Sequence, residues 1–168
     1  MTFHVRVSDP DDYDAVSALL ERSYSALMAP AYGDAFARVG GVIWTANRVL
    51  LRSGNFFVAV PEKGNSDILI GCGGWSLERP GSGDVEPGLG HIRHFGVDPK
   101  WLRKGVGRAI INECEAQARE EQVREFECYS SRNAETFYRA LGFKKTGIKQ
   151  LEMVDGAGLE SIVMRRKI

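Results

Sequence analysis

Apolar and polar residues alternate at the start of the chain and then recur at helical spacing. Residues 3–7 alternate, which predicts a half-buried strand. Ser8-Asp9-Pro10 predicts a helix start, because a capping side chain precedes proline at the first helical position. One face of that helix carries Val16, Leu19, Leu20 and Tyr24. A second helical region follows over residues 32–51, and we expect Gly40-Gly41 to divide or bend it.

The rest of the chain alternates between short apolar runs and helical segments. Strands are predicted at residues 56–60, 68–75, 91–97, 123–129, 145–153 and 159–166, and helices at 105–120 and 134–141. Three glycines within 68–75 indicate a bulge or a close backbone approach. The succession 91–97, 105–120, 123–129 implies one parallel pair of strands. We therefore predict a single α+β domain over residues 1–168, with the order βααβββαβαββ, a mixed, mostly antiparallel sheet and helices on both faces.

Composition narrows the classes of partner. The 168 residues carry 22 Lys+Arg and 22 Asp+Glu, so charge gives no reason to expect nucleic acid or an anionic membrane as a partner. No apolar run approaches the ~20 residues of a transmembrane helix, and residues 1–6 lack the apolar core of a signal peptide. Cys72, Cys114 and Cys128 are too few and too scattered for a disulfide framework or a zinc site. We therefore expect a cytoplasmic protein with reduced thiols and no metal.

The stretch after the 91–97 strand has the pattern of an anion-binding turn. Val97-Asp98-Pro99 ends the strand, and Arg103-Lys104-Gly105-Val106-Gly107-Arg108 leads into the next helix. The first turn of a helix carries unpaired N–H groups and the positive end of the dipole, and glycine lets a phosphate approach the backbone. This pattern predicts a ligand with a pyrophosphate, and a tight turn with solvated charges is the alternative. The sequence has neither a Walker motif nor a dinucleotide-binding G-x-G-x-x-G opening a first βαβ unit.

Two motifs in this order resemble the GNAT family of acetyl-CoA-dependent N-acetyltransferases. In that family a strand ending V-x-P precedes [QR]-x-x-G-x-[GA], and residues 97–107 match this pattern, with Leu102 in place of glutamine or arginine. Farther on, the family's A-x-x-x-Y-x-x-x-G-F segment is matched by Ala134, Tyr138, Gly142 and Phe143. Ser131 stands where the family often carries asparagine, and Asn133 lies nearby. The resemblance implies the GNAT fold with acetyl-CoA as cosubstrate.

The resemblance also implies which residues hold the cofactor. Main-chain amides and charged side chains of residues 103–108 would bind its pyrophosphate. Its peptide-like pantetheine arm would pair with the backbone of Phe95, Gly96 and Val97, where the two parallel strands separate. Ser131 and Asn133 are further candidate contacts. A main-chain N–H near Val97 would stabilise the tetrahedral oxyanion.

Acetyl transfer to an amine needs a proton donor and a proton acceptor. Tyr138 matches the family's general acid, which protonates the departing thiolate. The alternative is a buried tyrosine that only packs against the cofactor. An alkyl amine with a pKa of ~10.4 is protonated at neutral pH, so its attack needs a base.

The candidate bases lie in or near the 91–97 strand. We place His91 before His94, because several family members carry a glutamate at the position of His91 and because we expect His91 to share its strand face with the odd-numbered residues 93–97. Glu78 is a further candidate, and a bound water could also relay the proton.

These inferences point to direct transfer of an acetyl group from acetyl-CoA to an amine. Cys72 and Cys128 have no adjacent base in the sequence that would favour an acyl-enzyme. A non-catalytic acyl-CoA-binding or regulatory domain of the same fold stays open, as does transfer of a longer acyl chain. The acceptor, a small-molecule or peptide amine, would lie between residues 24–51, the loop 80–90 and the final hairpin. Dimers are common in the family, so a homodimer is also open.

Overall fold

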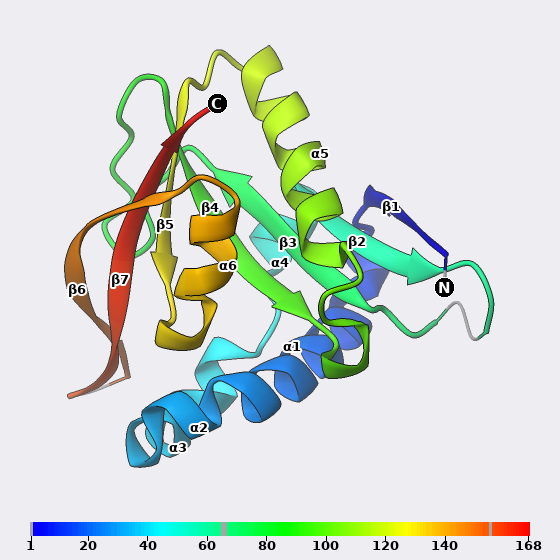
Figure 1. The fold of residues 1–168 in the computed structure, drawn as a ribbon, viewed down its shortest axis with the longest axis horizontal. Helices are drawn as coiled ribbons and strands as arrows, with labels where there is room; N and C mark the ends of the chain where they lie inside the picture. Colours follow the sequence, from blue (N-terminus) through cyan, green and yellow to red (C-terminus); the bar gives the residue numbers. More distant parts are fainter. Residues whose placement is uncertain (1, 65–66, 155) are drawn as a thin grey trace.

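The described residues, 2–64, 67–154 and 156–168 of this computed structural model, form one sheet of seven strands (Figure 1). The strands are β1 (Phe3–Val7), β2 (Phe56–Pro61), β3 (Gly71–Ser76), β4 (Leu89–Val97), β5 (Glu125–Ser130), β6 (Lys144–Val154) and β7 (Ala157–Lys167). They lie in the order β1-β2-β3-β4-β5-β7-β6. Only β4 and β5 are parallel neighbours within the part of the chain described, so the predicted mixed sheet and its parallel pair are confirmed.

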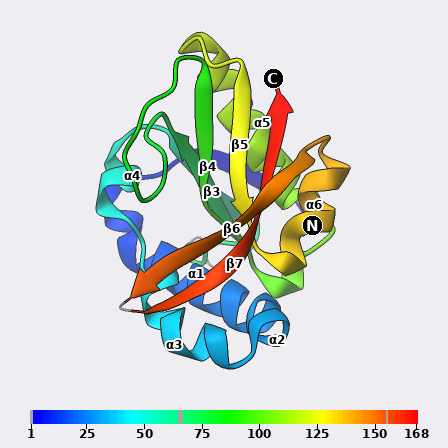
Figure 2. The ribbon, with the colours of Figure 1, turned by 90° about the vertical axis from the view of Figure 1, so that its left-hand side faces the viewer.

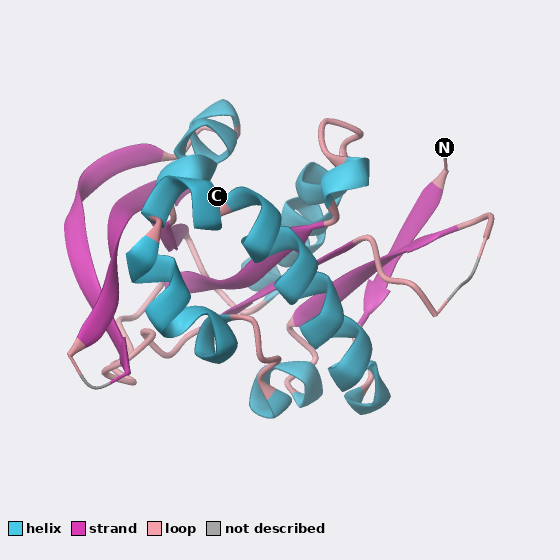
Figure 3. Ribbon diagram, turned by 90° about the horizontal axis from the view of Figure 1, so that it is seen from below, coloured by secondary structure: helices cyan, strands magenta, loops and turns pink. Residues whose placement is uncertain are grey.

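Helices cover both faces of the sheet (Figures 1 and 3). The α-helices are α1 (Tyr13–Leu27), α2 (Ala29–Tyr32), α3 (Asp34–Ile43), α4 (Arg48–Arg52), α5 (Val106–Glu120) and α6 (Glu135–Ala140). Short 3-10 turns, η1 (Pro10–Asp12), η2 (Pro99–Trp101) and η3 (Arg132–Ala134), precede α1, α5 and α6. α1 and α4 share one apolar core with β2 and β3, whereas α5 and α6 share another on the opposite face. The predicted placement of helices is therefore confirmed.

The N-terminal helical region is divided at other residues than predicted. We expected an interruption at Gly40-Gly41, but α3 continues through both glycines. A Cβ on Gly40 would lie 2.6 Å from the Trp44 ring, so this glycine lets Trp44 pack back against its own helix. The chain instead breaks at Gly33, where φ is +54°, and before α4, where Asn47 caps the N–H groups of the first turn.

The glycines of β3 have the close approaches predicted for them. The strand begins at Gly71, later than the predicted residue 68. A Cβ on Gly71 would lie 2.4 Å from Val106 Cγ1, so the absence of a side chain lets α5 sit against the sheet. A Cβ on Gly73 would lie 2.3 Å from the Phe95 ring. The predicted irregularity is also present, as a register shift between β3 and β4.

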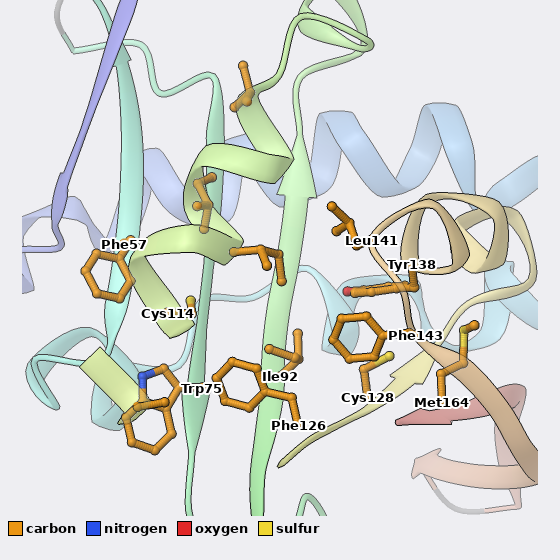
Figure 4. Packing of buried hydrophobic residues seen from close by; sticks show 14 of the residues in the cluster. Phe57, Trp75, Ile92, Cys114, Phe126, Cys128, Tyr138, Leu141, Phe143 and Met164 are labelled. Atoms are coloured by element: carbon orange, nitrogen blue, oxygen red, sulfur yellow. The ribbon is translucent and has the colours of Figure 1, made fainter. Parts of the chain in front are cut away.

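The main core lies between the sheet and the helices α5 and α6. Figure 4 shows Trp75, Phe126, Tyr138 and Phe143 within it, drawn from β3, β5, α6 and the segment after α6. A separate apolar cluster joins α2 and α3 to the β6–β7 hairpin, which reaches these helices in Figure 2. In the described part of the chain, no helix has both the length and the apolar composition that crossing a membrane requires.

Candidate active site

The parallel strands β4 and β5 separate after a short paired stretch. They pair at Leu89–Glu125, Gly90–Phe126 and His91–Glu127, at the start of β4. Beyond His91 the described residues of the two strands are not paired, whereas β5 stays paired with β7 as far as Ser130. The rest of β4, from residue 92 to 97, therefore has one edge free of strand partners.

Two cavities meet beside this free edge. The larger cavity, about 320 Å³, lies between α1–α3, β4, β5 and the β6–β7 hairpin. The smaller cavity, about 270 Å³, lies between α1, the end of β4 and the start of α6. Residues that line both are Tyr24, Met28, Phe95, Ser131, Ala134 and Tyr138. Part of the lining of the larger cavity comes from the segments expected to hold the acceptor, including Pro80 of the 80–90 loop.

The backbone edge of β4 is reached by two side chains of α1. The Tyr24 hydroxyl donates to the Phe95 carbonyl at 3.1 Å. The Val97 N–H donates to Ser23 Oγ at 3.3 Å. Phe95, Gly96 and Val97 all line the smaller cavity, so the structure brings the predicted pantetheine contacts together. Neither hydrogen bond could be predicted from the sequence, because the helical spacing of α1 shows its buried face and not the partners of the Ser23 and Tyr24 hydroxyls.

A bulge in β4 places the side chains that follow it on the opposite face of the sheet from the one expected. Gly74 pairs with Arg93 and Cys72 pairs with Gly96, so β4 has one extra residue over this interval. His94 takes up the extra residue with a left-handed φ of +50°. Phe95 and Val97 consequently pack with the core under α5, on the face of Ile92. The expectation that His91 shares its face with Phe95 and Val97 is wrong, because it assumed unbroken alternation.

His91 lies outside both cavities. Its side chain is 2% exposed, and its Nδ1 is 3.4 Å from Glu127 Oε1. Glu127 also accepts a hydrogen bond from Arg165 Nε at 2.8 Å and lies near Arg79. Burial lowers the pKa of His91, with Glu127 opposing this effect. His91 thus lies in a buried cluster of charged side chains.

His94 lines the larger cavity. Its Nδ1 is buried and has no hydrogen-bond partner among the described residues. Burial lowers the pKa of His94 to about 4, and the nearby Arg93 contributes to this shift. The imidazole is therefore neutral at pH 7. Glu78, the carboxylate considered as a base, lines neither cavity. Its backbone forms an isolated antiparallel β-bridge with Val85.

Tyr138 stands where the two cavities join. Its ring packs edge-on against Phe137 and Phe143, with centroid distances of 5.1 and 5.4 Å, and its side chain is 5% exposed. Burial raises the pKa of Tyr138 well above the usual value of 10. The phenol therefore stays protonated over the whole physiological range, as a proton donor must.

Buried thiols lie near the junction but are not ionised. Cys128 lines the larger cavity, and Cys72 Sγ donates to the His94 carbonyl at 3.5 Å. Burial raises the pKa of Cys72 to about 12 and raises that of Cys128 as well. A thiol in this state is a poor nucleophile.

The turn before α5 lies beside the smaller cavity. Arg103 and Gly105 have left-handed φ values of +59° and +84°, and Gly105 precedes the first residue of α5 without a side-chain cap. Arg103, Lys104, Gly105 and Arg108 are exposed, whereas Val106 and Gly107 are buried. None of the six lines either cavity, although Leu102 lines the smaller one.

The two glycines of this turn differ in role. A Cβ on Gly105 would meet nothing within 4 Å, so the surface in front of α5 is open there. A Cβ on Gly107 would lie 2.9 Å from the Phe137 ring. Gly107 thus allows α5 to pack against α6.

Ser131 and Asn133 follow β5 and line the smaller cavity. Ser131 also lines the larger cavity and precedes η3, so the turn into α6 sets its position. Among the described residues there is no group of three or more His, Cys, Asp or Glu side chains placed to hold a metal ion.

Comparison with known families identifies the class of protein to which this fold belongs. The sequence profile of the family described as "Acetyltransferase (GNAT) domain" matches residues 46–167. The chain belongs to the GNAT acetyltransferase family. A comparison with curated proteins found no match.

Solved structures share the fold at low sequence identity. A GCN5-related N-acetyltransferase from Rhodopseudomonas palustris has a TM-score of 0.73 and 17% identity, with 100% of this chain and 97% of that chain covered. PaiA N-acetyltransferase from Thermoplasma acidophilum, solved in complex with coenzyme A, has a TM-score of 0.72 and 18% identity, with both chains covered completely. Rv2747 from Mycobacterium tuberculosis, solved with CoA, has a TM-score of 0.65 and 20% identity, covering 98% of this chain and 99% of that chain. The predicted GNAT fold is thereby confirmed.

Proposed function

We propose that the protein is an acetyl-CoA-dependent N-acetyltransferase that transfers the acetyl group directly to an amine. The observation that carries this proposal is that Tyr138 lines both cavities. A thioester bound in the smaller cavity and an amine bound in the larger one would meet beside a protonated phenol. CoA complexes of the Thermoplasma acidophilum and Mycobacterium tuberculosis proteins support a cosubstrate of this class.

The smaller cavity and the start of α5 fit a CoA molecule. The β4 edge offers backbone groups to an amide-containing arm, and Ser131 and Asn133 add polar side chains. The α5 helix has 15 residues, an uncapped first turn and an open surface at Gly105, which suit a pyrophosphate. Arg103, Lys104 and Arg108 supply positive charge around the turn. Bound acetyl-CoA would supply the activated acyl group.

Two side chains of the larger cavity would donate and accept the protons of the reaction. Tyr138 would donate its phenolic proton to the leaving thiolate. His94 replaces His91 as the better placed proton acceptor, because His94 lines the cavity and His91 does not. Its neutral imidazole has a free lone pair at pH 7, since burial lowers its pKa to about 4. Buried surroundings also lower the pKa of a bound amine, which brings the two groups closer in basicity.

Replacement of the phenol tests the proposal. Tyr138→Phe keeps the ring contacts and removes the proton donor, so we expect kcat to fall about 100-fold or more in a CoA-release assay across amine classes, with CoA affinity unchanged. Tyr13→Phe is the matched control, because Tyr13 lies outside both cavities. Full activity of Tyr138→Phe would refute the assigned role.

The same assay separates catalysis from simple binding. If the wild-type protein binds CoA but acetylates no amine, a non-catalytic acyl-CoA-binding function replaces this proposal. An assay with acyl-CoA esters of increasing chain length tests for transfer of a longer acyl group, because apolar residues of the larger cavity would also accept a longer chain.

A further inference from the structure

The larger cavity has one permanently charged side chain in its described lining. Arg93 is the only Arg or Lys there, and no Asp or Glu is present. His94 is neutral at pH 7 because burial lowers its pKa to about 4. The remaining polar groups are hydroxyls and a thiol, from tyrosines, serines and Cys128. This lining has no negative charge that would balance an acceptor with two positively charged groups.

Arg93 is anchored through one nitrogen and lacks a carboxylate partner. Its Nη1 donates to Ser76 Oγ at 2.8 Å, and the Ser76 hydroxyl donates to the Glu78 carbonyl at 2.9 Å. Ser76 is 7% exposed, so the anchor lies inside the protein. No carboxylate of the described residues lies within ion-pair distance of Arg93, although the charge of Glu78 raises its pKa against the lowering effect of burial.

The remaining half-buried arginines of the described chain are paired, which makes Arg93 unusual. Arg79 and Arg165 both contact Glu127, and Arg166 contacts Glu115. A partly desolvated guanidinium without an anion is unfavourable, and its planar fork matches a carboxylate through two parallel hydrogen bonds. The anchoring bond of Arg93 uses only one of the five N–H groups of the guanidinium.

Part of the lining of the larger cavity is apolar. It is formed by residues from α3 and the β6–β7 hairpin: Val42, Ile43, Leu151, Met153 and Leu159. These side chains offer a place for a hydrocarbon group, while Arg93 of β4 faces the same cavity. A cavity of about 320 Å³ suits a small molecule that has both features.

We propose that the acceptor is a small amine with a carboxylate and an apolar side chain, whose carboxylate binds Arg93. This inference rests on the proposed function of the same cavity. An amino acid such as leucine has the three required groups, whereas a polyamine would place a second cation beside Arg93. Arg93 thus determines which acceptor binds, whereas His94 accepts a proton from the amine and Tyr138 donates one to the leaving thiolate.

A set of related amines tests this inference with the wild-type protein alone. Leucine, leucinamide and 3-methylbutylamine share the hydrocarbon group and differ in the carboxylate. We expect kcat/KM to be about 10- to 100-fold higher for leucine, the range expected from a charged hydrogen-bonded pair. Equal values for the three amines, or a preference for spermidine, would overturn the inference. Preference for the aminoalkyl phosphonate analogue of leucine would overturn the choice of a carboxylate.

Variants of Arg93 locate the effect. Arg93→Met should remove the preference for leucine over 3-methylbutylamine, and Arg93→Lys should retain part of the preference because the charge remains. Arg38→Met, at an exposed position of α3 outside both cavities, is the matched control. If Arg93→Met retains the full preference while it binds CoA normally, the inference is wrong. If Arg93→Met fails to fold, the inference is tested by Arg93→Lys and by the wild-type rates with leucine, leucinamide and 3-methylbutylamine.

Calorimetry separates this inference from the proposed function. N-acetylleucine is titrated into the wild-type protein and the Arg93 variants with CoA present. Binding that depends on Arg93, in a protein that acetylates no amine, would refute the transfer activity and support the carboxylate site. Transfer to amines without any Arg93-dependent binding would support the activity and refute the site.

Discussion

At the scale of single residues, burial sets the protonation states around the junction of the cavities. Tyr138 is held protonated and His94 is held neutral, because each is removed from water and neither gains a partner of opposite charge. The sequence motif indicated Tyr138 as a residue of the site, and in the structure Tyr138 lines both cavities. The sequence did not show that His94 lines the cavity and His91 does not, because the bulge in β4 was not evident from it.

The lowered pKa of His94 predicts a loss of stability in acid. The pKa is about 4 in the folded protein and about 6.5 in the unfolded chain, so the unfolded state takes up this proton first as the pH falls. The stability contribution of His94 is therefore complete above pH 6.5 and is lost towards pH 4. The loss should reach roughly 3 kcal/mol, at about 1.4 kcal/mol per pKa unit.

Urea unfolding between pH 7 and pH 4 measures this loss. His94→Asn cannot titrate, so its free energy of unfolding should fall less steeply with acidity than that of the wild type. His4→Asn, at an exposed position of β1, should follow the wild-type curve. Parallel curves for His94→Asn and the wild type would show that His94 keeps an ordinary pKa.

At the scale of elements, helix α5 is positioned by contacts that the sequence shows only in part. The glycines of β3 predicted a close approach, but not that α5 is the element that approaches. The apolar face of α5 was evident from its spacing, and Ile110, Ile111 and Cys114 are buried as expected. The break in β4 was not evident, because a left-handed histidine has no sequence signal comparable to that of glycine.

Gly71→Ala tests the seating of α5 on the sheet. The new Cβ would lie 2.4 Å from Val106 Cγ1 and 2.9 Å from Ile110 Cδ1, so we expect a loss of about 1–3 kcal/mol in the free energy of unfolding. Gly147→Ala in β6 is the control, because its Cβ would meet nothing within 4 Å. Its stability should stay within about 0.5 kcal/mol of the wild type. Equal stability of the two variants would mean that α5 is not tightly seated at Gly71.

At the scale of the whole molecule, the separation of β4 from β5 creates the site. The sequence predicted the parallel pair from its strand–helix–strand order, and the paired stretch is three residues long. Arg93 and the apolar residues of the same cavity come from β4, α3 and the final hairpin, which are far apart in the chain. Their meeting could not be predicted, because local patterns carry no information on which distant elements enclose a cavity.

The most direct test of the whole account is a crystal structure of the protein with bound CoA. We predict that the pyrophosphate contacts the amides at residues 103–108, that the pantetheine arm follows Phe95–Val97 through the smaller cavity, and that the thiol ends beside Tyr138. A pyrophosphate bound away from the start of α5, or a thiol that ends outside the junction of the two cavities, would contradict the account.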